Sequence, residues 1–206
     1  MRRLLGVAVG LAASVAPCSH HAAAQERFSD DGGEVRFRAD VLEREVVTDV
    51  SLIRHEGRYV VVHLAENRVF VFDGERAVWS APAGTGTGFR LDTGEHQWKF
   101  STPKGMFRVK RMEKDPLWEA PDWHFVEKGQ PVPDPTSPAR VMRGIMGSTA
   151  IYLGDGIAIH GTNQPQLLLN PDPELRRVSH GCIRLTNEAA RTLMYMVDVG
   201  TPVLIF

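Results

Sequence analysis

Residues 59–81 read YVVVHLAENRVFVFDGERAVWSA and indicate the fold class. Three short runs rich in Val and aromatic residues lie within this stretch, at 59–64, 69–72 and 77–81. Short polar segments, the second of them containing Asp73-Gly74, separate the runs. Such runs joined by tight turns are typical of consecutive antiparallel strands. The stretch therefore predicts the beginning of a β-meander.

Later segments continue the same pattern. Residues 106–111 alternate apolar and basic side chains, which predicts one half-exposed strand. Runs 150–153 and 157–160 flank Gly154-Asp155-Gly156 and predict a hairpin, and 203–206 predict a last strand. A helix is expected between these strands, capped by Thr186 or Asn187 and ended by Gly200, because four apolar residues follow helical spacing: Ala190, Leu193, Met194 and Val197. The predicted fold class is mainly β, with a few short helices.

The composition is that of an ordinary globular protein. Of the 206 residues, 43% are hydrophobic and 24% are charged, which excludes collagen-like and disordered classes. The 24 Lys and Arg residues nearly balance the 25 Asp and Glu residues, for a formal net charge of −1. This balance argues against a nucleic-acid partner.

The N-terminus has the features of an export signal over residues 1–24. Two arginines precede a short apolar run, and the small residues 22–24 offer a cleavage site. The run is too short to span a bilayer as a helix. Lipidation of Cys18 is the less favoured alternative, because Pro17 stands where a small residue is expected. Residues 25–56 then form an N-terminal extension, in which 41–53 could be a helix, and residues 57–206 form the main domain.

Two segments of unusual composition interrupt the predicted strands. Glycines 84, 86 and 88 are not followed by the Lys-Ser/Thr pair or the helix of a phosphate-binding loop, and they predict a flexible turn. The segment at about 113–142 holds many prolines, which makes a regular helix or central strand unexpected there. It also carries Trp118 and Trp123, so we expect an ordered flap packed over a cleft.

Cys182 is the only cysteine that remains after the predicted cleavage, so it has no partner for a disulfide within the chain. It is either an inert core residue or a thiol kept for its chemistry. Two histidines could accept its proton. His160 ends a predicted strand and is favoured over His180, which lies only two positions from the cysteine. Gly181 would allow a substrate to approach the backbone, and the Gly161 carbonyl could fix the tautomer of His160.

At these residues the sequence resembles the L,D-transpeptidase catalytic domain, or YkuD, family. The resemblance rests on 159–163 (IHGTN) and 179–184 (SHGCIR), with further agreement at 102–107 (TPKGMF) and 154–160 (GDGIAIH). It covers residues 58–206 and implies a β-sandwich of mixed sheets with short helices. The Pro-rich segment falls where the family carries a substrate-covering flap.

The resemblance also implies roles for individual residues. Cys182 would be the acylated nucleophile and His160 the general base, and the N–H groups of Gly181 and Cys182 would form the oxyanion hole. The remaining expected substrate-binding residues are Ser179, His180, Arg184, Gly161, Thr162, Trp118 and Trp123. No metal or cofactor is expected.

The implied reaction joins peptidoglycan stem peptides in the periplasm or cell envelope, without a membrane span after signal cleavage. Cys182 would attack a tetrapeptide stem and release D-Ala, and an amine would then resolve the thioester to give a 3-3 crosslink or an attached protein. Carbapenems would acylate the same thiol. Resolution by water, as in an L,D-carboxypeptidase, is the main alternative.

Two other classes of function are disfavoured. A zinc site of His160, His180 and Cys182 lacks typical ligand spacing, and a wall-binding module would not need the thiol. Arg140 and Arg143 are interpreted as solvated charges, with binding of an acidic stem peptide as the less favoured alternative.

Overall fold

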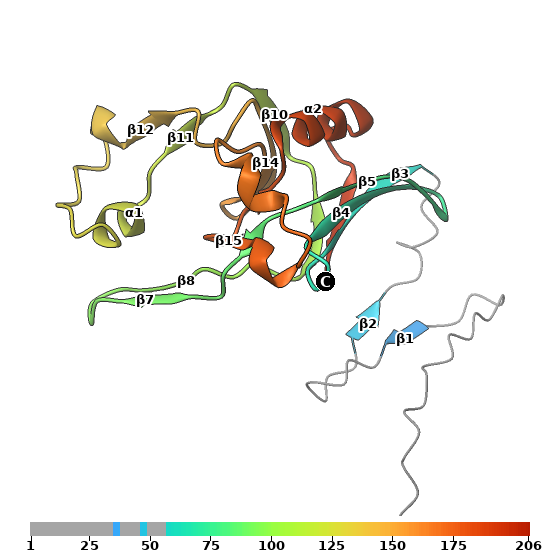
Figure 1. The fold of residues 1–206 in the computed structure, drawn as a ribbon, viewed down its shortest axis with the longest axis horizontal. Helices are drawn as coiled ribbons and strands as arrows, with labels where there is room; N and C mark the ends of the chain where they lie inside the picture. The colour runs from blue at the N-terminus through green and yellow to red at the C-terminus, as the bar shows by residue number, and fades with distance from the viewer. Residues whose placement is uncertain (1–34, 38–45, 49–56) are drawn as a thin grey trace, which may run out of the picture.

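Two β-sheets share one hydrophobic core in the computed structural model, which describes residues 35–37, 46–48 and 57–206 (Figure 1). The larger sheet has five strands in the order β5-β4-β3-β17-β9. Its strands span Arg76–Pro82 (β5), Arg68–Asp73 (β4), Arg58–His63 (β3), Pro202–Ile205 (β17) and Gly105–Arg108 (β9). The C-terminal strand β17 lies parallel to β3, and the other neighbours are antiparallel.

The second sheet has four strands in the order β10-β13-β14-β16. These strands span Arg111–Lys114 (β10), Thr149–Gly154 (β13), Ile157–His160 (β14) and Ile183–Arg184 (β16). Strands β13 and β14 form an antiparallel hairpin, whereas β16 returns from a distant part of the chain and pairs with β14 in parallel. This parallel pairing positions the site described below.

The core lies where alternate side chains of the two sheets meet. Val60, Val62, Val69 and Val71 of the larger sheet are almost fully buried, because side chains two apart on a strand share a face. Helix α2 (Asn187–Met196) adds Ala190 and Leu193 and packs against β13 and β14 (Figure 1). The Thr186 hydroxyl caps this helix by accepting a hydrogen bond from the Ala189 N–H.

Smaller elements surround these two sheets. Parallel strands β6 (Thr85–Gly86) and β15 (Arg177–Ser179) lead toward Cys182, and β7 (Arg90–Asp92) and β8 (Gln97–Lys99) form a projecting hairpin (Figure 1). In the flap, β11 (Leu117–Glu119) pairs with β12 (Val141–Arg143) on either side of helix α1 (Asp122–Val126). Short 3₁₀ turns η2, η3 and η4 span Pro138–Arg140, Pro165–Leu168 and Glu174–Arg176.

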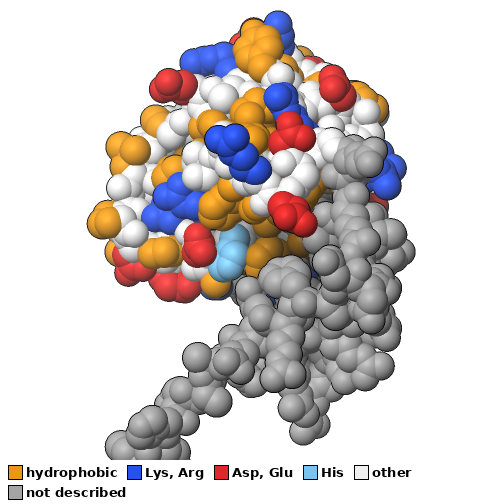
Figure 2. All heavy atoms as spheres, turned by 90° about the vertical axis from the view of Figure 1, so that its right-hand side faces the viewer, with side chains coloured by type: hydrophobic (Ala, Val, Ile, Leu, Met, Phe, Trp, Pro, Cys, Tyr) orange, Lys and Arg blue, Asp and Glu red, His pale blue; other side chains and the backbone are white. Residues whose placement is uncertain are grey.

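The structure confirms the predicted fold class and most of the predicted elements. The meander, the hairpin around Asp155 and the helix capped by Thr186 are all present. Figure 2 shows basic, acidic and hydrophobic side chains interspersed on one face, which agrees with the balanced charge of the sequence.

Four local predictions are wrong. The single strand predicted at 106–111 is two strands, because Val109 exchanges hydrogen bonds with the 200–201 turn while the chain passes from one sheet to the other. The predicted flexible turn is rigid at Gly86, where an added Cβ would lie 2.5 Å from the Phe100 carbonyl oxygen. The Pro-rich flap contains α1 and a strand pair despite its prolines. Helix α2 ends at Met196, before the predicted stop at Gly200.

The N-terminal predictions fall mostly outside the described residues. The export signal, Cys18 and most of the extension belong to this part of the chain. Within the predicted helix at 41–53, Val46–Thr48 instead form strand β2, which pairs with β1 (Val35–Phe37). No helix in the part of the chain that the structure describes is long and apolar enough to cross a membrane.

Candidate active site

Cys182 and His160 lie on the same face of two adjacent parallel strands. The register pairs Ile159 with Ile183 and His160 with Arg184. Ile159 and Ile183 point into the core, so their neighbours in sequence point to the opposite face. Cys182, directly before β16, is therefore a diagonal neighbour of His160, with their Cα atoms roughly 8 Å apart by strand spacing.

The thiol of Cys182 points along this face away from His160. Its S–H donates to the Gly156 carbonyl at 3.7 Å, and the residue packs against a small cluster that contains Ala158 and Trp118. Cys182 is only half-buried. The structure thus brings the thiol and the imidazole onto one face without a hydrogen bond between them.

The surroundings of the thiol disfavour the thiolate. Burial raises the pKa of Cys182, opposed in smaller measure by the Ala158 N–H and the positive charge of Arg184. Arg184 is itself half-buried, and burial lowers the pKa of its guanidinium. Within residues 57–206 this guanidinium forms no ion pair with a carboxylate. It is a desolvated cation beside the thiol.

His160 is buried and held in one tautomer. Its Nδ1 lies 2.5 Å from the Gly161 carbonyl oxygen, and because a carbonyl can only accept, Nδ1 carries the hydrogen. Nε2 is then left with a free electron pair. Burial lowers the pKa of His160 to about 4, against the opposing effect of the Gly161 and Met146 carbonyls. The ring is therefore neutral at pH 7, and the expected orientation by Gly161 is confirmed.

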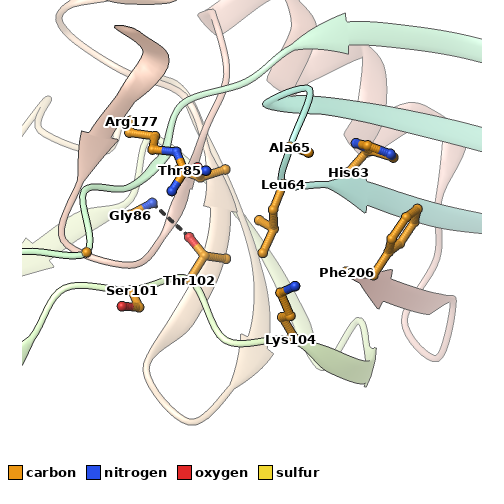
Figure 3. Close-up of a pocket in the computed structure, with 11 residues that line it drawn as sticks. His63, Leu64, Ala65, Thr85, Gly86, Ser101, Thr102, Lys104, Arg177 and Phe206 are labelled. Carbon is orange, nitrogen blue, oxygen red and sulfur yellow. Dashed lines mark hydrogen bonds between the residues drawn. The ribbon is translucent and has the colours of Figure 1, made fainter. Parts of the chain in front are cut away.

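The loop before Cys182 is held by two hydroxyl groups. Ser179 Oγ donates to the Cys182 carbonyl at 2.6 Å and accepts from the Gly181 N–H at 3.1 Å. Thr102 Oγ1 donates to the Gly181 carbonyl at 2.8 Å and accepts from the Gly86 N–H at 2.9 Å, the contact dashed in Figure 3. Gly181 has φ +131°, which other residues adopt only with strain. The backbone next to the thiol is consequently fixed.

His180 contacts the flap rather than Cys182. Its ring stacks on Trp123 with centroids 4.2 Å apart, and its Nε2 lies 2.9 Å from the Glu127 carboxylate. Phe100 meets the same ring edge-on at 4.5 Å. Burial lowers the pKa of His180, and Glu127 opposes that shift. Trp118 extends the flap cluster toward the thiol, 5.9 Å from Trp123.

Arg140 organises the flap from within, so its prediction as a solvated charge is wrong. Its side chain is buried and donates to the carbonyls of Ala120, Pro133 and Asp134, as well as to the Asp122 carboxylate at 2.6 Å. These acceptors surround one guanidinium, so its N–H groups have hydrogen-bond partners within the protein and need no solvent. Arg143 ends the exposed strand β12.

Two residues expected to bind substrate make contacts within the protein. Thr162 is buried, and its hydroxyl accepts a hydrogen bond from the Gln164 N–H. Gly161 donates to the Thr149 carbonyl and lies against the side-chain oxygen of Asn187, where an added Cβ would clash. Asn187 also accepts from the Ser148 N–H at 3.1 Å. These contacts fix the backbone that carries His160.

A groove of about 520 Å³ lies near, but does not include, the thiol. Its walls include Lys104, Arg177, Phe206 and the Thr102 side chain that supports Gly181 (Figure 3). Neither Cys182 nor His160 lines it. Across the described ranges 35–37, 46–48 and 57–206, no three His, Cys, Asp or Glu side chains are grouped so that they could hold a metal ion.

The YkuD family, the L,D-transpeptidase catalytic domain, matches residues 57–205. The chain belongs to this family. The probable L,D-transpeptidase YbiS of Escherichia coli is 36% identical over 155 residues, which cover 72% of this chain and 44% of YbiS. The probable L,D-transpeptidase ErfK/SrfK of Salmonella typhimurium is 36% identical over 152 residues, 70% of this chain and 42% of its own length. The chain thus aligns with less than half of either relative.

Solved L,D-transpeptidases share the fold. The enzyme from Xylanimonas cellulosilytica has a TM-score of 0.51 at 21% identity, covering 73% of this chain and 61% of its own. The enzyme from Mycobacterium smegmatis has a TM-score of 0.50 at 20% identity, covering 72% and 58%. The expected family and β architecture are confirmed.

Sequence reasoning missed three residues that support the site: Thr102, Glu127 and Asn187. Thr102 lies in the TPKGMF segment, which was singled out as a strand and not for a hydroxyl. Asn187 was considered only as a helix cap. Glu127 had no signal in the sequence, because its contact with His180 joins residues 53 positions apart.

Proposed function

We propose that this chain is an exported cysteine L,D-transpeptidase that acts on tetrapeptide stems of peptidoglycan. In this proposal residues 57–206 are the catalytic domain, 25–56 an extension and 1–24 a signal that directs the protein to the periplasm or cell envelope. Family membership and two relatives named as probable L,D-transpeptidases support the reaction class. The acyl donor is a stem peptide, and the acceptor is an amine of a second stem peptide or of a protein.

The placement of Cys182 and His160 on one face of β14 and β16 carries the proposal. A thiol with a raised pKa needs a base, and a buried imidazole with a pKa of about 4 is unprotonated and able to serve. The two groups would thus work as a neutral pair, with the proton leaving sulfur during attack. Attack would require the sulfur to leave the Gly156 carbonyl and approach the ring.

Acylation follows from this pair. The sulfur attacks the carbonyl of the third stem residue while its proton passes to Nε2 of His160. The N–H of Cys182 would stabilise the oxyanion, whereas the N–H of Gly181, expected to share this role, donates to Ser179 Oγ. The C–N bond then breaks, the proton passes from His160 to the departing amine, and D-Ala leaves behind a thioester.

Arg184 and the flap would hold the donor peptide. A half-buried guanidinium without a carboxylate partner in the described chain gains a charge-assisted contact when a stem carboxylate binds. Trp118 packs in the same cluster as Cys182 and offers an apolar wall for the stem. The second half-reaction places an amine on the thioester and gives a 3-3 crosslink or an attached protein.

Product analysis tests this function. Full-length protein is incubated with disaccharide tetrapeptide, and products are separated and weighed by mass spectrometry. We expect crosslinked dimer and free D-Ala, with no product from Cys182→Ala. Release of D-Ala with tripeptide alone would assign an L,D-carboxypeptidase. Equal behaviour of wild type and Cys182→Ala, with binding but no turnover, would contradict an enzymatic function and favour a wall-binding module.

A further inference from the structure

The ring of His180 is held on three sides by side chains from distant segments. Trp123 stacks on it with an interplanar angle of 17°, and Phe100 meets it edge-on at 79°. Glu127 accepts from its Nε2 at 2.9 Å. A half-buried imidazole with a stacked face, a packed edge and a bonded nitrogen has little freedom to reorient.

Two of these three contacts come from the flap. Trp123 lies in α1, and Glu127 is the C-cap residue directly after that helix. Within residues 57–206, the Glu127–His180 pair is the one acid–histidine contact that joins the flap to the loop 179–184. The Arg140 network orders the flap internally but reaches no residue of this loop.

His180 links the position of the flap to that of the reacting sulfur through the backbone. It immediately precedes Gly181, whose carbonyl is fixed by Thr102, and Cys182 follows. Trp118 lies 5.9 Å from Trp123 and packs against the same small buried cluster as Cys182. The flap therefore contacts this loop at His180 and, through Trp118, shares a packing cluster with Cys182.

We propose that Glu127 is a positioning residue that docks the flap on the catalytic loop through His180, and so favours an amine over water as the acyl acceptor. The proposal rests on the thioester chemistry proposed above. With an amine, a C–N bond forms, the C–S bond breaks, and the proton released by nitrogen returns to sulfur. With water, a C–O bond forms instead and the product is a free acid. A docked flap keeps bulk water from the thioester.

Hydrogen exchange measured by mass spectrometry tests the docking step without any need for activity. In Glu127→Ala, peptides that cover α1 and residues 179–184 should exchange on the order of fivefold faster than in wild type. Glu127→Gln, which retains an oxygen acceptor, should give a smaller change. Glu119→Ala serves as the matched control, because Glu119 is an exposed flap carboxylate in β11 without a contact to His180.

Product partition tests the consequence of docking. The ratio of crosslinked dimer to tripeptide is measured at equal donor concentration, together with the rate of acyl-enzyme formation. Glu127→Ala should lower the ratio several-fold, by a larger factor than it lowers the rate of acylation, and Glu119→Ala should match wild type in both. A merely structural role would lower both quantities together.

Separate outcomes overturn the two proposals. Unchanged exchange in Glu127→Ala overturns the docking, whatever the activity. Faster exchange with an unchanged product ratio overturns the role in acceptor choice. Absence of an acyl-enzyme in wild type itself would overturn the proposed function and, with it, the role in acceptor choice, while the exchange result would still decide whether Glu127 docks the flap.

Discussion

Burial of a neutral His160 makes the stability of the domain depend on pH in a way that can be calculated. In the folded protein the ring binds a proton only near pH 4, whereas in the unfolded chain it does so at its ordinary pKa of 6.5. The unfolded state therefore binds more protons between these values, and the free energy of unfolding falls as the pH falls. Linkage gives a loss of about 3 kcal/mol from this residue between pH 7 and pH 4.

Urea unfolding followed by tryptophan fluorescence measures this loss. Other groups also titrate in this range, so the informative quantity is the difference between wild type and His160→Gln, whose amide stays neutral. The stability advantage of wild type over the variant should shrink by about 3 kcal/mol from pH 7 to pH 4. A difference that stays constant across this range would show that His160 titrates normally in the folded protein and would refute the neutral-pair argument.

Three further predictions concern the supports of the site. Thr102→Val should lower the free energy of unfolding by about 2 kcal/mol, because the Gly86 N–H and Gly181 carbonyl lose their partner, whereas Thr102→Ser should retain most of it. Equal loss in both variants, measured in urea, would contradict this. Arg140→Met should speed proteolysis within the flap several-fold, and an unchanged cleavage pattern would argue against its organising role. Iodoacetamide should alkylate Cys182 more slowly than free cysteine at pH 7 and faster as the pH rises, and rapid reaction at pH 6 would indicate a preformed thiolate.

The predictable part of the fold is the part with local signals. Alternating apolar residues predict β3, β4 and β5. The Gly154-Asp155-Gly156 turn predicts a hairpin, and Thr186 predicts the start of α2. Two-residue strands such as β6 and β16 have no periodicity to detect. Their existence depends on pairing with distant segments, β15 and β14, which a local pattern does not contain.

The site was predictable in its chemistry but not in its geometry. Cys182 and His160 could be singled out because a thiol and an imidazole carry reactivity wherever they lie. Their shared face depends on the parallel register of β14 and β16, which follows a long connection. Arg140 is buried because backbone carbonyls turn inward around it, and nothing in its neighbouring sequence indicates this.

Intact-mass measurement of the full chain, quenched in acid during reaction with a tetrapeptide donor and no added acceptor, tests the central claim most directly. We predict a covalent adduct of the tripeptide acyl group, located by peptide mapping at Cys182 and missing from Cys182→Ala. D-Ala release at the wild-type rate by Cys182→Ala, or an adduct mapped to another residue, would contradict the account.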